Sequence, residues 1–154
     1  MCMIQVGLAA PDFSGVNQEG QEIKLSDYKG NKLILYFYPK ASTPGCTAES
    51  CDFRDHFIPL KAKGFAVVGV SADNIKRQKN FADKNHLPFP LIADEKREII
   101  NAYGCWGPKK LYGKEYEGIY RKTFVIDEKG DIELIIEKVK TKAATEQILA
   151  ALEI

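Results

Sequence analysis

The chain has 154 residues, and its 22 lysines and arginines nearly balance 21 aspartates and glutamates, giving a formal net charge of +1. With 45% hydrophobic and 28% charged residues, its composition is that of an ordinary globular protein, and we expect one domain over residues 1–154. The small net charge disfavours a nucleic acid or an anionic membrane as a partner. The sequence shows neither an apolar run of the ~20 residues that span a membrane nor a secretory signal, so we expect a cytoplasmic protein.

Strand-like and helix-like segments alternate along the chain. We expect strands at residues 13–16, 21–25, 32–38, 65–71, 89–93, 121–126 and 131–138. We expect helical segments at 26–30, 44–63 with a kink near Pro59, 75–85, 95–103 and 143–152, and a glycine-rich loop at 104–118. Parallel strand–helix–strand steps followed by a hairpin and a helix predict an α/β protein. The simplest fit is a thioredoxin-like fold, a mixed central sheet flanked by helices, with an N-terminal β-hairpin extension.

Cys46 lies where a hydrophobic strand gives way to a helix. Thr43 suits the N-cap and Pro44 suits the first helical position, so Cys46 falls at the third. The N–H groups of a first helical turn have no intrahelical acceptor, and the helix dipole is positive there. Such a position stabilises an anion and favours the thiolate, which is the nucleophilic form of cysteine. The pattern therefore indicates a reactive thiol, and the alternative is a small core residue near a helix start.

Cys51 follows five residues later on the same expected helix. Helix geometry places two Cα atoms with this spacing roughly 8–9 Å apart. A disulfide needs a separation below about 7 Å, so the pair cannot close while the helix is intact. Either the two thiols are not linked by redox chemistry, or the first turns of the helix unwind. The Cys-x4-Cys spacing also differs from the Cys-x-x-Cys of simple thioredoxin-type dithiols.

A metal site is a second interpretation of the same helix. Cys46, Cys51 and His56 are regularly spaced, but five-residue steps turn each side chain about 140° from the last. The three side chains therefore cannot converge on one ion. We expect no metal site, and we expect His56 and His86 to be surface or half-buried residues.

Several longer motifs resemble one enzyme family. Pro39-x-x-x-Thr43-x-x-Cys46 matches the active-site signature of the peroxiredoxins, and the surrounding string is similar to the bacterioferritin comigratory protein group, also called PrxQ. The resemblance runs almost from end to end. It includes Ala10-Pro-Asp-Phe13, Leu25-Ser-Asp-Tyr28, Tyr103-Gly-Cys-Trp-Gly107, Lys110-Leu-Tyr-Gly-Lys114 and Arg121-Lys-Thr-Phe-Val-Ile-Asp127.

This resemblance implies roles for both helix cysteines. Cys46 corresponds to the peroxidatic cysteine, which attacks a hydroperoxide and becomes a sulfenic acid. Cys51 corresponds to the resolving cysteine of many members, which forms an intramolecular disulfide after local helix unwinding. Thioredoxin or a similar dithiol would then reduce that disulfide. The resemblance thus implies a thioredoxin-dependent peroxiredoxin that reduces hydrogen peroxide and organic hydroperoxides and needs no cofactor. Members of the family are monomers or dimers, and we expect a monomer because the cysteine pair can cycle within one chain.

Four further residues correspond to active-site positions of the family. Thr43 would bind the peroxide or the thiolate through its hydroxyl, and Pro39 would shield the site. Arg121 would stabilise the thiolate and bind the peroxide oxygens with its permanent charge. Glu49 would orient Arg121.

Two other classes of function stay open from the sequence. A thiol–disulfide oxidoreductase acting on proteins would have a similar fold, although the missing Cys-x-x-Cys and the presence of Thr43 and Arg121 oppose it. A non-enzymatic interaction protein would show no peroxide-dependent oxidation of thioredoxin. The resemblance leaves Cys105 and Cys2 without a catalytic role; we expect a buried small hydrophobe and a terminal thiol, respectively. Trp106 could wall the pocket or simply pack.

Overall fold

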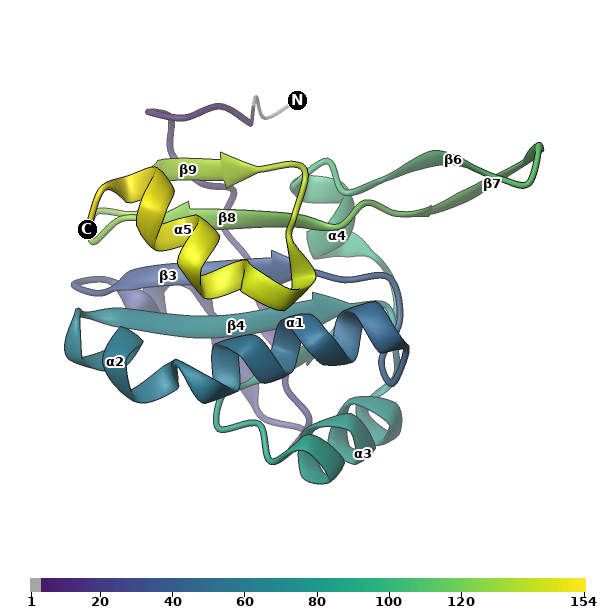
Figure 1. Cartoon of the computed structure of the whole chain (residues 1–154), viewed down its shortest axis with the longest axis horizontal. Coiled ribbons are helices and arrows are strands. Elements are labelled where there is room, and N and C mark those ends of the chain that lie inside the picture. The colour runs from purple at the N-terminus through teal and green to yellow at the C-terminus, as the bar shows by residue number, and fades with distance from the viewer. Residues whose placement is uncertain (1–3) are drawn as a thin grey trace.

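The computed structural model describes residues 4–154, so Cys2 lies outside the described residues (Figure 1). Its strands are β1 (Ser14–Val16), β2 (Glu22–Lys24), β3 (Lys32–Phe37), β4 (Phe65–Ser71), β5 (Leu91–Ala93), β6 (Trp106–Leu111), β7 (Lys114–Ile119), β8 (Lys122–Ile126) and β9 (Ile132–Ile136). Its α-helices are α1 (Pro44–Asp55), α2 (Phe57–Ala62), α3 (Ile75–Asn85), α4 (Glu98–Ala102) and α5 (Ala144–Leu152). Short 3₁₀ turns, η1 (Leu25–Tyr28) and η2 (Thr141–Ala143), complete the described elements.

A five-stranded sheet in the order β5-β4-β3-β8-β9 forms the centre of the fold. Strands β3, β4 and β5 are parallel, whereas β8 and β9 are antiparallel to their neighbours. Strand β3 is central and almost wholly apolar, as expected of a strand covered on both faces. The expected α/β fold with a mixed sheet and flanking helices is therefore confirmed, as is the short N-terminal hairpin of β1 and β2.

Hydrophobic side chains cover both faces of this sheet. One buried cluster joins Tyr36 of β3 and Tyr38 just after it to Phe53 of α1 and to apolar residues of α2, α3 and α5. The other joins Phe37 of β3 to Tyr103 and to apolar residues of α4 and the N-terminal segment. Figure 1 shows α1 and α5 side by side on one face, with the end of β3 leading to the start of α1. The core thus fixes the strand-to-helix junction that carries Cys46.

The expected single helix over 44–63 is two helices in the structure. Helix α1 ends at Asp55 and α2 begins at Phe57, so the break comes at His56 rather than at Pro59. Proline has no N–H to donate to the carbonyl four residues earlier, and its ring crowds that carbonyl. For Pro59 that carbonyl belongs to Asp55, which accounts for the position of the break. Helix α4 is likewise shorter than expected, because the Asp94 carboxylate accepts from the backbone N–H of Glu98 and starts the helix there.

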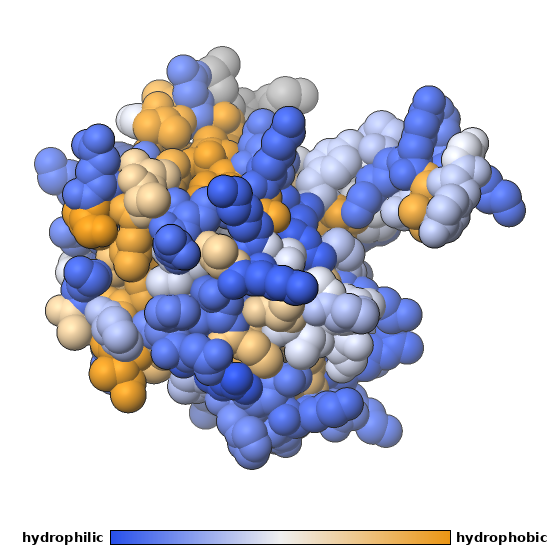
Figure 2. Space-filling model, viewed as in Figure 1, coloured by the Kyte–Doolittle hydropathy of each residue, from blue (hydrophilic) through white to orange (hydrophobic). Residues whose placement is uncertain are grey.

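The expected loop over 104–118 is wrong, because this segment is the β-hairpin β6–β7. Tyr112 and Gly113 form its two-residue turn with φ values of 52° and 78°. Two successive residues with positive φ match the twist of a tight hairpin, which favours glycine at such positions. Pro108 lies inside β6 and weakened the strand pattern in the sequence. The hairpin extends away from the body of the molecule (Figures 1 and 2). Leu111 at the end of β6 and Tyr112 in the turn are both exposed.

Within residues 4–154, no helix has the length and apolar character needed to cross a membrane.

Candidate active site

The loop after β3 delivers Cys46 to the first turn of α1. Thr43 occupies the N-cap with extended backbone angles of φ −89° and ψ 155°, and Pro44 follows inside the helix. The N–H of Thr47 donates to the Thr43 carbonyl over 2.8 Å, which closes the first turn around the sulfur. Cys46 itself is fully buried. The expected cap, proline and cysteine positions are therefore those of the structure.

The hydroxyl of Thr43 does not bond to the helix that it caps. Its Oγ1 donates to the Lys40 carbonyl over 2.8 Å, and no side-chain cap hydrogen bond forms. This contact fixes the hydroxyl in the loop before the helix and leaves the N–H groups of the first turn without a side-chain acceptor from Thr43. Pro39 is half-buried at the start of the same loop. Both residues belong to the segment that leads from β3 into α1.

Arg121 joins the two acidic partners of the site. It lies directly before β8, where its Nη2 donates to Cys46 Sγ over 3.3 Å and its Nη1 donates to Glu49 Oε1 over 2.8 Å. Burial alone would lower the pKa of Arg121, but the neighbouring Cys46 sulfur and Glu49 carboxylate raise it overall. A guanidinium held by two acceptors is positioned to stabilise negative charge on the sulfur. The structure thus brings together three expected site residues that lie far apart in the sequence.

Glu49 is a buried carboxyl group with only one oxygen satisfied. Its side chain is fully enclosed, and Oε2 has no hydrogen-bond partner among the described residues. Burial raises the pKa of Glu49 to about 7, although Arg121 opposes the shift. Desolvation thus outweighs the ion pair, which fits the general rule that a charge removed from water is costly even when paired.

We expect the stability of this site to depend on pH through Glu49. A carboxyl pKa raised from 4.5 to about 7 means that the folded state binds the proton more tightly than the unfolded state. Stability from this group is then full at acidic pH and falls as the pH rises from about 4.5 to about 7. Glu49→Gln should remove that fall, so the variant should gain roughly 2–3 kcal/mol relative to the wild type between pH 5 and pH 8. Urea unfolding at both pH values measures this; a constant difference between the two proteins would contradict it.

Cys51 lies on the same helix but outside the charged cluster. It is half-buried, and its Sγ donates to Asn85 Oδ1 of α3 over 3.7 Å. Cys46 and Cys51 are both free thiols on the intact helix α1, whose geometry keeps their Cα atoms roughly 8–9 Å apart. The structure therefore shows the arrangement in which this pair cannot form a disulfide.

A buried chain of hydrogen bonds supports the loop before Cys46. The Tyr38 hydroxyl donates to Gln78 Oε1 over 2.6 Å, and Gln78 Nε2 donates to Ser71 Oγ over 2.9 Å. Ser71 Oγ donates in turn to Asp73 Oδ2 over 2.6 Å, and the same oxygen accepts the Ala41 N–H over 2.8 Å. Sequence reasoning missed these residues, because each is a routine polar side chain and only the folded sheet aligns them. The one available signal was polar residues at buried positions of strand and helix patterns.

Two residues after α4, the thiol Cys105 and the aromatic Trp106, lie outside the cluster of Cys46, Arg121 and Glu49. Cys105 is buried, and burial raises the pKa of its thiol to about 12, so the expectation of a small buried hydrophobe is confirmed. Trp106 packs against Arg97, whose guanidinium lies 4.2 Å from the ring centroid. Its Nε1 also donates to Glu117 over 2.9 Å. Trp106 therefore packs against β7 and the start of α4.

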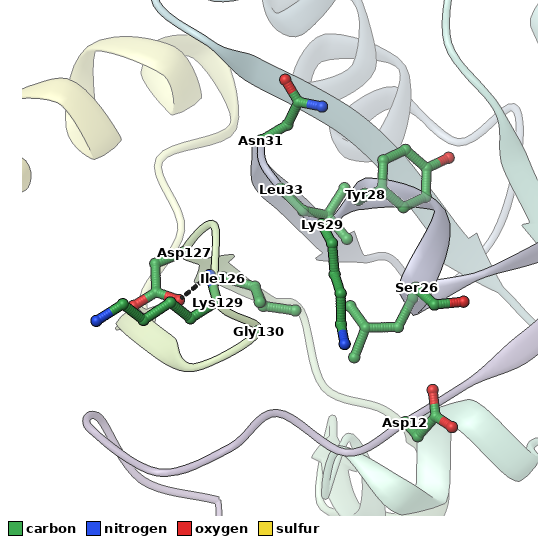
Figure 3. A pocket seen from close by; sticks show the side chains of 11 residues that line it. Asp12, Ser26, Tyr28, Lys29, Asn31, Leu33, Ile126, Asp127, Lys129 and Gly130 are labelled. Carbon is green, nitrogen blue, oxygen red and sulfur yellow. Dashed lines mark hydrogen bonds between the residues drawn. The ribbon is translucent and has the colours of Figure 1, made fainter.

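Two of the hollows in the surface differ in where they lie relative to Cys46 and Arg121. One of about 450 Å³ opens beside Arg121 and is lined by Lys109, Tyr120, Lys122 and Glu137. Another of about 260 Å³ lies near the first residue of β3, with Leu33 in its wall and Lys29 at its side (Figure 3). Cys46 follows the last residues of β3, so the second hollow belongs to the other end of the strand. The hollow beside Arg121 shares that residue with the site, because the same guanidinium donates to Cys46 Sγ.

The histidines take no part in the cluster: His56 and His86 are both exposed. Over residues 4–154, no group of three or more histidine, cysteine, aspartate or glutamate side chains is arranged to hold a metal ion.

A thioredoxin-like sheet that carries a helix-start cysteine against an arginine defines a thiol-based redox protein. The sequence matches the AhpC/TSA family over residues 6–135. It is 42% identical over 150 residues to peroxiredoxin Bcp of Bacillus subtilis, covering 97% of this chain and 96% of that protein. It is 41% identical over 138 residues to peroxiredoxin Bcp of Escherichia coli, covering 90% and 88% of the two chains.

Solved structures agree with these relatives. Peroxiredoxin Q of Xanthomonas campestris superposes with a TM-score of 0.88 at 34% identity, covering 96% of each chain. PrxQ of Xylella fastidiosa superposes with a TM-score of 0.91 at 28% identity, covering 99% of this chain and 98% of that one. The chain belongs to the AhpC/TSA family, within its Bcp/PrxQ peroxiredoxins, and is a thiol-dependent peroxidase.

Proposed function

We propose that Cys46 is the peroxidatic cysteine of this enzyme, acting on hydrogen peroxide and organic hydroperoxides. The observation that carries the proposal is the 3.3 Å contact between Arg121 Nη2 and Cys46 Sγ at the start of α1. The thiolate attacks one peroxide oxygen and the O–O bond breaks. That oxygen stays on sulfur as a sulfenic acid, and the other leaves as water or an alcohol after taking up a proton.

Charge moves during this step from the sulfur to the leaving oxygen. Arg121 already donates to the sulfur and faces the open hollow, so its guanidinium can follow the charge onto the peroxide oxygens. Glu49 holds the other guanidinium nitrogen and fixes its direction. Thr43 and Pro39 border the approach; the Thr43 hydroxyl, already bonded to Lys40, retains lone pairs that can accept from the incoming hydroperoxide.

Cys51 resolves the sulfenic acid in this mechanism. Its sulfur attacks the Cys46 sulfur, an S–S bond forms, and the hydroxyl leaves as water. The Cα atoms of Cys46 and Cys51 lie roughly 8–9 Å apart in the intact helix, so the start of α1 must unwind first. The Cys46–Cys51 disulfide is then reduced by thioredoxin or a similar dithiol, which is itself oxidised to a disulfide. Because both cysteines belong to one chain, a monomer completes the cycle.

Organic hydroperoxides join hydrogen peroxide as substrates in this proposal. A structural study of the Xanthomonas campestris bacterioferritin comigratory protein, 33% identical to this chain, concerns its alkyl peroxide reduction activity. The hollow beside Arg121 is open and is also lined by Tyr120, so an alkyl group has room beside the guanidinium that contacts the sulfur.

Cys51→Ser is expected to separate the two halves of the cycle. The first oxidation of Cys46 should proceed at the wild-type rate, because Cys51 lies outside the Cys46–Arg121–Glu49 cluster. Dithiol-driven turnover should fall at least tenfold, and a sulfenic acid should accumulate. Stopped-flow oxidation with one equivalent of peroxide, followed by mass spectrometry with a sulfenic-acid probe, measures both. Unchanged turnover would assign resolution to another thiol.

The rival oxidoreductase function is distinguished by the oxidant. Hydrogen peroxide should oxidise the reduced protein stoichiometrically within seconds and yield a peptide that joins Cys46 to Cys51. A protein that responds only to disulfide substrates, and not to peroxide, would refute the peroxidatic role of Cys46.

A further inference from the structure

The second half of α1 is tied to three other elements. Ser50 shares a buried 2.8 Å hydrogen bond with the Tyr36 hydroxyl of β3. The Asp52 carboxylate accepts the backbone N–H of Thr145 over 2.8 Å, at the start of α5. Helix α5 has no side-chain cap from its own N-cap residue, Ala143, so α1 supplies an acceptor to it. These contacts bind the second half of α1 to the sheet and to the last helix.

Arg54 adds a third tie of the same kind. Its Nη1 donates to the Asn85 carbonyl at the end of α3 over 2.9 Å. Phe53 between these polar ties is fully buried, with its ring centroid 4.9 Å from that of Tyr36. From residue 50 to residue 54, each side chain therefore contacts β3, α3 or α5, Cys51 included through Asn85.

The first half of the helix is held differently. Among the described residues, only two side chains of residues 44–49 form hydrogen bonds to the rest of the protein. They are Cys46 and Glu49, and both accept from Arg121. One of those two contacts depends on negative charge at the sulfur. Conversion of the thiolate to a neutral sulfenic acid removes that charge, so oxidation weakens the contact between Arg121 and Cys46. The ion pair between Arg121 and Glu49 then remains as the polar tie of this half, and the contacts of the second half are unchanged.

We infer that Asp52 and Arg54 are positioning residues that hold Cys51 still, so that only residues 44–49 unwind and the oxidised Cys46 moves to Cys51. This inference rests on the proposed disulfide between the two cysteines. A fixed Cys51 presents its sulfur at a high effective concentration to the moving sulfenic acid, whereas a frayed helix would spread it over many positions. Only a few ångströms of approach are needed to bring the Cα atoms within disulfide range.

Hydrogen exchange on the wild-type protein tests the boundary. In an intact helix the N–H of residue i bonds to the carbonyl of residue i−4. Unwinding of residues 44–49 frees the amides of 47–49 but keeps those of Arg54, Asp55 and His56, whose acceptors are Ser50, Cys51 and Asp52. We expect the disulfide form to lose at least tenfold protection at 47–49 and to keep it at Arg54–His56 and at Thr145. Loss of protection at Arg54–His56 or at Thr145 would overturn the inference.

Two variants test the consequence for catalysis. Asp52→Ala/Arg54→Ala should let peroxide oxidise Cys46 within twofold of the wild-type rate, slow disulfide formation about tenfold, and increase sulfinic acid under excess peroxide. Asp52→Asn/Arg54→Lys retains an acceptor for Thr145 and a donor for Asn85, so it should recover most of the rate of disulfide formation. This recovery would show that the slow rate of the double alanine variant is not a simple folding defect.

A matched control removes a comparable tie elsewhere. Lys32→Ala breaks a half-buried 3.1 Å ion pair with Glu133 on β9, away from α1, and should resolve at the wild-type rate. If the double alanine variant closes its disulfide as fast as this control, Cys51 needs no anchoring and the inference is wrong. If the wild type forms no sulfenic acid and no disulfide, the proposed function fails together with it; a disulfide that forms with full unwinding of α1 overturns the inference alone.

Discussion

Cys46→Ser is expected to abolish hydroperoxide reduction, with a loss of roughly 10⁴-fold or more, as for the removal of other covalent nucleophiles. A serine hydroxyl has nearly the same shape and would keep its place at the first turn of α1 beside Arg121. It does not ionise under these conditions, so it cannot attack the O–O bond. Consumption of hydrogen peroxide in an assay coupled to a dithiol reductant measures the loss.

Cys105→Ala is the matched control for this change. Cys105 is a buried thiol whose pKa is raised to about 12, and its Sγ bonds to the Tyr103 carbonyl away from Arg121. The variant should keep its peroxidase rate while losing some stability from the small cavity. Appreciable turnover by Cys46→Ser, or a comparable loss in Cys105→Ala, would show that Cys46 is not the attacking residue.

Arg121→Ala is expected to raise the barrier of peroxide attack by about 2–4 kcal/mol, equivalent to about 30- to 1000-fold in rate. The guanidinium is the cation that donates to Cys46 Sγ, and no charge of the alanine variant replaces it. Oxidation of Cys46 in single-turnover stopped flow measures the rate without a contribution from disulfide formation. A rate equal to that of the wild type would place Arg121 outside the mechanism.

The same change leaves Glu49 buried without its partner, and such a loss is itself destabilising. Arg121→Ala/Glu49→Gln removes the uncompensated carboxylate and so separates the electrostatic effect on the sulfur from the effect on folding. Both alanine-containing variants should be slow in peroxide attack, whereas only the single variant should lose stability through an unpaired carboxylate. Recovery of the wild-type rate in the double variant would mean that Arg121 serves only to neutralise Glu49.

The sequence predicted the parts of this fold that depend on local pattern. The apolar run of β3, the glycine-containing strand β4 and the periodic helix α3 have the expected bounds to within a residue. The cap and proline before Cys46 also placed the thiol in the first turn of α1. These features follow from backbone rules that act over a few residues, so a single sequence expresses them.

Features that depend on distant contacts were harder to predict. The approach of Arg121 to Cys46 joins residues 75 positions apart, and only a family resemblance suggested it. The β6–β7 hairpin was missed because Pro108 interrupts its strand pattern. Two hydrogen bonds also had no signal in the local sequence. Asp52 accepts from the N–H of Thr145 and Asp73 accepts from the N–H of Ala41, and both contacts join segments that only the folded chain brings together.

The bond between Asp73 and Ala41 has a consequence for repeated use of the enzyme. The loop that precedes α1 is attached through Asp73 and Ser71 to β4 and through Gln78 to α3, and none of these groups belongs to α1. In the proposed cycle, the start of α1 can therefore unwind and refold while the loop before it keeps its hydrogen bonds. If Cys46 moves to Cys51 as proposed, reduction of the disulfide returns its sulfur to a loop of unchanged geometry, and successive peroxide molecules meet the same site.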